Sequence, residues 1–167
     1  MKPGDIDQEF LAVLNRYQPL VRRVCRMYAD TPEERTDLFQ ETLYQLWRSY
    51  PSFQGRSHVA TWVYRVALNT AITAVRKKRR TPEHVPLNED SGHGTISTHD
   101  PEPDLRVDVL YRAMDALTPI ERALVMLYLD DISYQEMADI LGLSESNIGV
   151  KLNRIRSKLQ DWLRGSP

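Results

Sequence analysis

The sequence predicts an all-α protein: two small helical domains joined by a flexible acidic linker, the C-terminal domain being a helix-turn-helix. Apolar residues recur at spacings of three and four along most of the chain, and no convincing alternating strand pattern is present. Residues 81–104 contain four prolines, two glycines and little apolar content, so they bury too little surface to offset the entropy of ordering. We therefore predict domains over residues 1–80 and 105–167, with residues 81–104 as the linker.

Three helices are expected in the first domain. Apolar spacing predicts the first from Phe10 to Tyr28, and Pro19 is expected to kink it or split it in two. A second helix is predicted after Thr31, where an N-cap candidate, a proline and two acids follow one another. A third is predicted over residues 58–80. The apolar face expected for the second helix carries Phe39, Leu43, Leu46, Trp47 and Tyr50.

Four helices are expected in the second domain, the first beginning near Leu105. A capping-box pattern at Thr118, with proline at the first helical position, opens the next helix. Ser133 stands three residues before an acid and opens a short helix. That helix ends at Gly142, because glycine readily adopts a left-handed C-terminal conformation. A last helix is predicted over residues 144–163.

Residues 132–159 have the layout of a helix-turn-helix: a short helix, a tight turn at Gly142 and a longer helix. Ala138 is small at the point where the two helices must cross. The longer helix has an apolar stripe, and its other side carries residues suited to base edges and phosphates. A solvated amphipathic helix is the alternative, and the motif alone does not separate a repressor from a polymerase subunit. The stripe is Ile148, Leu152, Ile155 and Leu159, and the other side has Asn147, Lys151, Arg154 and Lys158.

Charge is distributed unevenly although the net charge is −1. Residues 1–80 hold 14 basic and 8 acidic residues, whereas residues 81–104 hold no basic and 6 acidic residues. This asymmetry suggests contact with nucleic acid. The helix over residues 58–80 ends in five consecutive basic residues. This is more positive charge than is needed to complement the helix dipole, so it suggests contact with phosphates. Trp62 fits either the core or a stacking site for a base. The expected polar stripe of this helix is His58, Thr61, Arg65, Asn69, Thr73 and Arg76.

The helix over residues 37–50 differs from the basic one. Its expected exposed side is mixed or acidic, which would repel DNA. From the residues alone, plain solvated surface is favoured over a surface that binds a basic protein. The exposed positions are Asp37, Gln40, Glu41, Gln45 and Arg48.

Several classes of protein do not fit the sequence. No stretch approaches the roughly 20 apolar residues needed to span a bilayer, and residues 1–10 have no apolar signal segment, so we expect a cytoplasmic protein without membrane insertion. Cys25 is the single cysteine, which excludes an internal disulfide and a Cys-rich zinc site. We find no phosphate-cradling glycine loop and no nucleophile with a paired base. We therefore expect no enzyme activity, no cofactor and no metal; the linker residues His84, His93 and His99 lack any accompanying cysteine.

At this point the motifs resemble those of a known family. DLFQETLYQLW (residues 37–47), then SFQGRSHVATWVYRVALNTAI (52–72) and the basic run, resemble the core-binding and promoter-melting domain of sigma factors of the sigma-70 family. The segment from Leu117 to Leu159 resembles their C-terminal domain. The short length, and a linker without a domain between the two helical domains, are similar to those of the extracytoplasmic-function subgroup. The resemblance covers nearly the whole chain, with two motifs in the expected order.

The resemblance implies a sigma factor that binds core RNA polymerase and promoter DNA, and in some members an anti-sigma factor. It implies polymerase binding by Asp37, Leu38, Gln40, Glu41 and Trp47, which reverses the preference for plain solvated surface. Together with the polar stripe, the resemblance implies that the loop over residues 53–58 and the third helix contact the −10 element and help to melt the DNA. The residues of this site are His58, Thr61, Trp62, Arg65, Asn69, Arg76 and Lys77. It implies −35 recognition by Ser146, Asn147, Gly149, Val150, Lys151, Asn153, Arg154 and Lys158.

Some positions depart from the family pattern. A basic residue is common where this chain has Gly149, an arginine is common at Leu68 and an acid at Thr73, so the preferred promoter sequence does not follow from the family. The resemblance also suggests that the acidic linker occupies positively lined polymerase channels, through Glu83, Glu89, Asp90, Asp100, Glu102 and Asp104.

A stand-alone helix-turn-helix regulator, whose first domain dimerises or binds a small ligand, is the alternative. It predicts tight sequence-specific DNA binding by the free protein. A sigma factor instead predicts weak binding alone and specific binding with polymerase.

Overall fold

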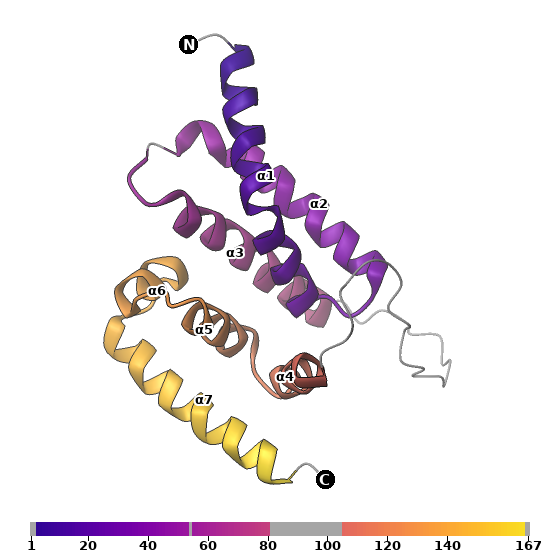
Figure 1. Ribbon diagram of the computed structural model, residues 1–167, viewed down its shortest axis with the longest axis vertical. Helices are drawn as coiled ribbons and strands as arrows, with labels where there is room; N and C mark the ends of the chain where they lie inside the picture. The colour runs from indigo at the N-terminus through magenta and orange to yellow at the C-terminus, as the bar shows by residue number, and fades with distance from the viewer. Residues whose placement is uncertain (1–2, 54, 81–104, 166–167) are drawn as a thin grey trace.

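Seven α-helices and one short 3-10 helix make up the computed structural model, which describes residues 3–53, 55–80 and 105–165 (Figure 1). Within those residues there is no strand, and the all-α prediction is confirmed. Residues 81–104, with the linker acids and His84, His93 and His99, lie outside the described residues. The helices are α1 (Pro3–Tyr28), α2 (Pro32–Ser49), the 3-10 helix η1 (Tyr50–Ser52), α3 (Val59–Arg80), α4 (Leu105–Asp115), α5 (Pro119–Leu129), α6 (Tyr134–Leu141) and α7 (Glu145–Gly165).

Local signals set the helix starts as predicted. Thr31, Thr118 and Ser133 each accept a hydrogen bond from the backbone N–H three residues on, and the glutamate there returns a bond to the cap backbone. Each such box satisfies two N–H groups that the helix leaves unpaired, and loss of a cap typically costs about 1 kcal/mol. Gly142 ends α6 with φ 67° in the left-handed region, also as predicted.

Pro19 lies inside α1, which continues through it as a single helix, so of the two predicted outcomes, a kink or a split, the split does not occur. Pro19 is exposed, whereas Val21 and Val24, two and five residues later, are fully buried. Packing of this buried side against α2 and α3 stabilises the helix on both sides of the proline. That packing outweighs the one backbone hydrogen bond that proline removes.

The first helical group consists of α1, α2 and α3, which pack against one another. Aromatic contacts hold η1 and the loop after it against the start of α3. The Tyr50 and Trp62 ring centroids are 5.9 Å apart, and Phe53 stacks on Trp62 at 4.9 Å. The segment before α3 is therefore anchored to the core at its Phe53 end.

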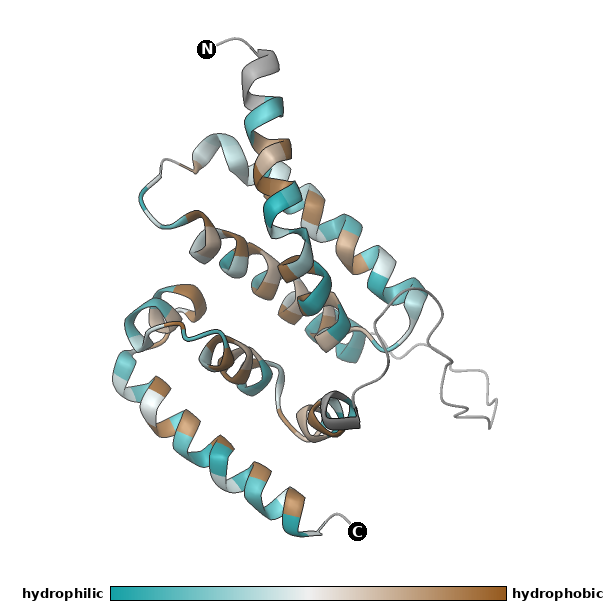
Figure 2. Cartoon of the chain, in the orientation of Figure 1, coloured by the Kyte–Doolittle hydropathy of each residue, from teal (hydrophilic) through white to brown (hydrophobic). Residues whose placement is uncertain are grey.

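The second helical group contains α4 to α7 and lies below the first in the view of Figure 1. Its central helix is α5, whose residues 123–127 are all buried, and α5 packs against both α7 and α3. Apolar side chains of both groups form one continuous core, and Figure 2 shows apolar residues recurring along α7 among polar ones. None of the described helices is long and apolar enough to cross a membrane.

Candidate nucleic-acid interface

The turn between α6 and α7 is built from local backbone bonds. The Gly142 N–H donates to the Ala138 carbonyl, and the Leu143 N–H donates to the same oxygen over 3.1 Å. The Ser144 hydroxyl then accepts from the Asn147 N–H over 3.2 Å, which caps the start of α7. This is the geometry of a helix-turn-helix, in which the second helix projects its first turns outward.

The inner side of α7 is the apolar stripe that its spacing predicts. Ile148, Leu152 and Ile155 are buried, and Leu159 is half-buried beside them. The proposed −35 residues lie off this stripe. Gly149 and Lys151 are half-buried at its margins, and the exposed positions are Ser146, Asn147, Val150, Asn153, Arg154 and Lys158. Their contact with DNA stays a prediction.

Lys158 has a partner within the protein. Its Nζ donates to Glu121 Oε1 over 2.6 Å, and Glu121 also belongs to the capping box at the start of α5. The ion pair ties α7 to α5, a role that sequence spacing does not reveal because the two residues lie 37 positions apart. We therefore leave Lys158 out of the proposed DNA reader.

This ion pair makes a pH-dependent contribution to stability. Burial raises the pKa of the Glu121 carboxyl, but hydrogen bonds from Lys158 and from the Thr118 N–H outweigh it and lower that pKa below its ordinary value of 4.5. A lowered folded-state pKa means that the stabilisation is present above pH 4.5 and is lost as the pH falls through the folded pKa. We expect Glu121→Gln, which can still close the capping box, to lower the free energy of unfolding at pH 7 by about 1 kcal/mol.

Urea denaturation of wild type and variant at pH 7 and pH 3 measures this difference, which should shrink at the lower pH. The matched control is Glu136→Gln in the Ser133 capping box, because among the described residues Glu136 bonds only to Ser133. A Glu121→Gln effect of equal size at both pH values would show that the charge is not involved.

Gly149 is a departure from the family pattern that the fold does not require. It lies in the second turn of α7, and a Cβ added there would meet Tyr134 Cε2 at 3.8 Å, an ordinary van der Waals distance. We expect Gly149→Ala to raise the free energy of unfolding by about 0.5–1 kcal/mol, because alanine restricts the unfolded chain more than glycine does. Urea denaturation tests this, and a lower midpoint would mean that the Tyr134 ring cannot accommodate the methyl group.

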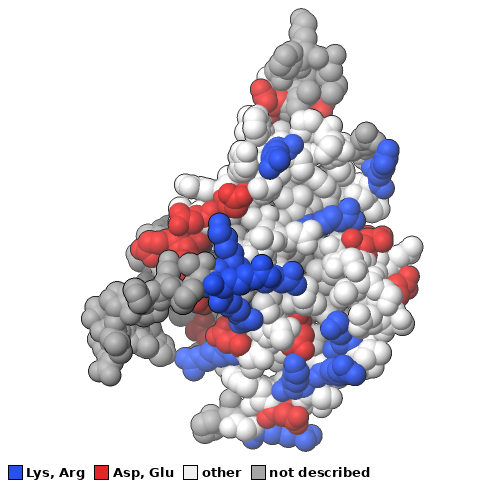
Figure 3. All heavy atoms as spheres, turned by 180° about the vertical axis from the view of Figure 1, so that it is seen from behind, with Lys and Arg blue, Asp and Glu red and all other residues white. Residues whose placement is uncertain are grey.

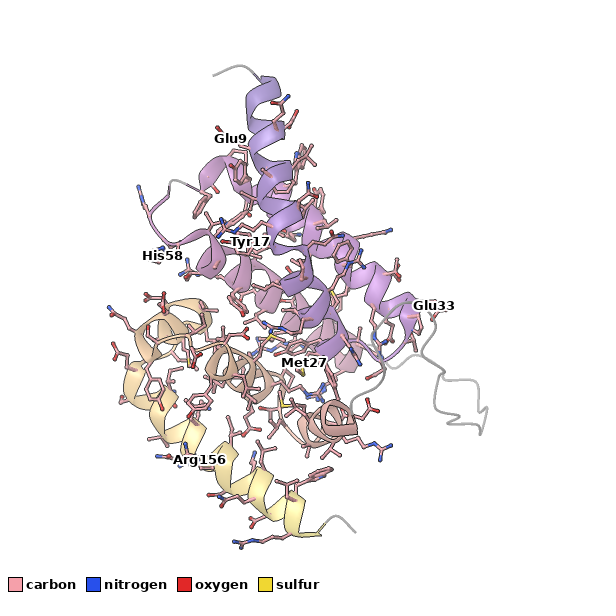
Figure 4. The ribbon with its side chains drawn as sticks, viewed as in Figure 1. Glu9, Tyr17, Met27, Glu33, His58 and Arg156 are labelled. Atoms are coloured by element: carbon pink, nitrogen blue, oxygen red, sulfur yellow. The ribbon has the colours of Figure 1, made fainter. Side chains whose placement is uncertain are left out.

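Several proposed −10 residues are accessible before α3, at its middle and at its C-terminal end. His58 is exposed in the loop just before the helix, where Figure 4 labels it, and its carbonyl accepts the Trp62 N–H over 3.1 Å. Asn69, Arg76 and Lys77 are also exposed. Seen from behind, the molecule has a group of Lys and Arg side chains near the middle of its face (Figure 3).

One cation of the basic run is paired within the protein. Lys78 Nζ donates to Glu34 Oε1 over 2.6 Å, and this bond holds the pKa of the Glu34 carboxyl below its ordinary value. The partner belongs to the capping box of α2, so Lys78 joins the end of α3 to the start of α2. The other four basic residues of the run, at positions 76, 77, 79 and 80, are exposed.

The first two turns of α3 correct the expected polar stripe. Thr61 is only 6% exposed and Arg65 is half-buried, so this part of the stripe does not face solvent. Trp62 is 7% exposed beneath Phe53, which places it in the core and not on an open stacking surface. The physical reason is that α5 and α6 cover a second side of α3, a contact between domains that the pattern of one helix does not contain.

The exposed face of α2 carries the residues proposed for polymerase binding, with two corrections. Leu38 is buried in the core, so its side chain is not part of the surface. Trp47, expected on the apolar face, is 57% exposed, because the buried positions are Leu38, Thr42 and Leu46. Tyr44 is 51% exposed and lies one turn before Trp47. Its spacing of three residues from Trp47 is the only sequence signal that could have placed it on the same face. The surface residues, here called the α2 face, are Asp37, Gln40, Glu41, Tyr44 and Trp47.

The α2 face has the composition of a protein-binding surface. Large aromatic groups left uncovered beside polar residues mark interaction sites more often than isolated apolar residues do. Gln45 Nε2 donates to Glu41 Oε1 over 2.8 Å, which orients the carboxylate next to the aromatic pair. Among the described residues, no group of three or more His, Cys, Asp or Glu could hold a metal ion.

Two family descriptions match the chain, one in each helical group. Sigma-70 region 2 matches residues 13–81, and Sigma-70 region 4 matches residues 108–159. The first match covers most of α1 and all of α2 and α3, including the α2 face. The second covers the helix-turn-helix.

Relatives match along most of the chain. It is 29% identical to the ECF RNA polymerase sigma factor SigG of Mycobacterium tuberculosis, over 91% of this chain and 48% of that protein, so it spans about half the length of SigG. It is 27% identical to the ECF RNA polymerase sigma-E factor of Haemophilus influenzae, over 98% of this chain and 92% of that protein.

Solved structures share the fold. The sigma factor RpoE of Bartonella quintana, in complex with the anti-sigma factor NepR, superposes with a TM-score of 0.71 at 24% identity, covering 98% of this chain and 99% of that one. CnrH, in complex with the cytosolic domain of CnrY, superposes with a TM-score of 0.69 at 18% identity, covering 96% of this chain and 91% of that one. With both regions matched in order and relatives aligned over nearly its full length, the chain belongs to the sigma-70 family, among its extracytoplasmic-function sigma factors.

Proposed function

We propose that this chain binds core RNA polymerase through the α2 face and directs transcription initiation from promoters that its two helical groups read. The observation that carries the proposal is the exposure of Trp47 and Tyr44 beside Asp37 and Glu41, on a helix whose other side is packed into the core. An exposed aromatic pair flanked by acids suits a partner surface with basic and apolar groups, whereas it would repel DNA. The chain then acts as a binding protein and not as an enzyme.

The −35 element is assigned to the first turns of α7, which enter the major groove in a helix-turn-helix protein. Asn147 and Arg154 are exposed and carry groups that pair with adenine and guanine edges. We assign phosphate contacts to Ser146, Lys151 and Asn153, and such contacts fix a recognition helix in the groove. Gly149 and Val150 supply small or apolar contacts at the centre of this surface.

The −10 element is assigned to the segment over residues 53–58 and to the exposed polar residues of α3. The basic end of the helix, Arg76 and Lys77, attracts the phosphate backbone. His58 and Asn69, which are exposed, contribute hydrogen-bonding groups. Capture of an unstacked base offsets part of the few kcal/mol that unstacking costs. Because Trp62 is covered by Phe53, the ring available to such a base is that of Phe53, which is half-buried.

A protein inhibitor is a further proposed partner. The solved structure of Bartonella quintana RpoE contains the anti-sigma factor NepR. An anti-sigma factor for this chain would compete with polymerase or with DNA for the surfaces described above.

The test is co-elution of the purified full-length chain with bacterial core RNA polymerase on gel filtration at near-physiological salt. We expect a stoichiometric complex that initiates transcription at specific promoters, and weak DNA binding by the chain alone. A folded chain, free of bound inhibitor, that fails to co-elute yet binds a DNA sequence tightly by itself would instead be a stand-alone regulator.

A further inference from the structure

The outward side of α7 has an apolar residue at its centre. Ile148 is fully buried, whereas Val150, which lies two residues or about 200° further around the helix, is 49% exposed. Gly149 is half-buried beside it and contributes no side chain. Residues three and four positions apart are neighbours on a helix, so Ser146 and Asn153 lie one turn before and one turn after this pair. An exposed branched side chain therefore stands in the middle of the surface proposed to enter the groove.

Tyr134, the first residue of α6, extends this apolar centre from a second helix. Figure 1 shows α6 beside the first turns of α7, and the two helices are in contact. A Cβ added at Gly149 would meet Tyr134 Cε2 at 3.8 Å, so the tyrosine ring lies next to the bare backbone of the glycine. The ring is also partly open to solvent, because Tyr134 is 42% exposed. Tyr134, Gly149 and Val150 are here called the apolar patch.

Polar residues border the apolar patch. Ser146 and Asn153 are exposed on α7, and the Ser146 hydroxyl lies 3.3 Å from the hydroxyl of Ser144, the residue that caps the helix. Asn147 and Arg154 are exposed on the flank of Val150. Single exposed apolar residues are common on protein surfaces, but these are adjacent and lie inside a polar, basic face. Such an arrangement suits a ligand that has one small apolar group among polar ones.

The major groove of DNA has such a group in the 5-methyl of thymine. The other base-edge groups that distinguish the base pairs there are nitrogen and oxygen donors and acceptors. A glycine permits a close approach between the helix backbone and a ligand, because it has no Cβ. Gly149 also lacks the long basic side chain that would pair with guanine O6 and N7. Burial of one methyl group raises affinity roughly fourfold, which is enough to set a base preference.

We propose that the apolar patch binds the 5-methyl group of a thymine in the −35 element, so that Tyr134, Gly149 and Val150 determine the preferred base at one position. This inference rests on the proposed function for the placement of α7 in the major groove. It adds a preference that the family pattern does not supply, because a basic residue is common where this chain has Gly149. The patch selects against cytosine, which has no methyl group at that position.

The experiment starts from the −35 sequence that the complex of the full-length chain with core RNA polymerase selects from randomised DNA. Each thymine of that sequence, on either strand, is replaced in turn by deoxyuridine, which lacks the 5-methyl group and keeps the O4 acceptor. Competition binding measures the affinity of the complex for each DNA. We expect one thymine whose replacement weakens binding about threefold to fivefold, and little change at the others.

Variants of the apolar patch test whether the protein is what senses the methyl group. Val150→Thr keeps the branched shape of the side chain and exchanges one methyl group for a hydroxyl, whereas Gly149→Lys places a long basic chain beside the Tyr134 ring. We expect both variants to lose most of the difference between thymine and deoxyuridine. Gly149→Lys should in addition favour guanine at that position, because a lysine can pair with O6 and N7.

The matched control is Leu163→Thr, another exchange of an exposed apolar residue for threonine on α7. Leu163 is 58% exposed and lies near the end of the helix, beyond the helix-turn-helix. We expect this variant to retain the full difference between thymine and deoxyuridine. Equal effects of Leu163→Thr and Val150→Thr would overturn the assignment of the methyl contact to the patch.

The remaining outcomes separate this inference from the proposed function. A selected −35 sequence without thymine, or equal affinity for thymine and deoxyuridine at every position, would overturn the patch and leave the proposed function intact. A difference that persists in Val150→Thr and Gly149→Lys would mean that the methyl group acts through DNA shape, which also overturns the patch. If the chain forms no complex with core polymerase, the proposed function fails. The same comparison on DNA selected by the free chain then decides the patch, and selection of no DNA by either form overturns both.

Discussion

Replacing Trp47 with alanine is expected to weaken binding to core RNA polymerase by about 2 kcal/mol or more, roughly a 30-fold increase in Kd. Trp47 is 57% exposed, and Tyr44 lies on the same face one turn away. A tryptophan that becomes fully desolvated at the centre of an interface is the type of residue that dominates binding energy. Because its side chain is mostly outside the core, the free energy of unfolding should change by less than about 0.5 kcal/mol.

Titration of the labelled full-length chain with core polymerase measures the effect. The matched control is Leu11→Ala on α1, since Leu11 is 53% exposed and lies in the same helical group. Equal losses from both variants would mean that apolar exposure in general, and not the α2 face, drives the association. A Trp47→Ala chain that binds like wild type would remove this face from the polymerase contact.

Features that depend on neighbours in the chain could be predicted from the sequence. The starts of α2, α5 and α6 follow from a hydroxyl residue and a glutamate three positions apart, and the end of α6 follows from one glycine. The apolar stripe of α7 is likewise local, because spacings of three and four place its members on one side. For this reason the positions proposed for −35 recognition lie off the buried stripe, and their contact with DNA stays a prediction.

Features that depend on distant residues could not be predicted in this way. The ion pair between Lys158 and Glu121 and the hydrogen bond from Arg23 to Asp130 join residues that no periodicity relates. The burial of Thr61 has the same origin, because the second group packs against α3, a contact that the pattern of this helix alone does not contain. Trp47 shows the opposite error: hydrophobicity alone suggested the core, whereas the buried side of α2 is set by Leu38 and Leu46.

Replacing Arg154 with alanine is expected to weaken recognition of the −35 element by about 1–3 kcal/mol, roughly 5-fold to 150-fold. Arg154 is exposed on α7, off the buried stripe. An arginine that reads the major groove pairs with the O6 and N7 atoms of a guanine. A bidentate contact of this kind discriminates between bases, so the loss should be largest on the preferred sequence and small on sequences with another base at that position. Loss of a phosphate contact would instead weaken all sequences alike.

The measurement uses the polymerase complex of the full-length chain and compares the selected −35 sequence with single-base variants of it. Arg156→Ala is the matched control, since Arg156 is also an exposed arginine on α7 (Figure 4). It lies two residues further on, more than half a turn around the helix, and is directed away from the groove-facing side. If Arg154→Ala and Arg156→Ala lose affinity equally on every sequence, Arg154 contributes charge and not base recognition. The specificity of α7 would then depend on Asn147 and on the apolar centre formed by Gly149 and Val150.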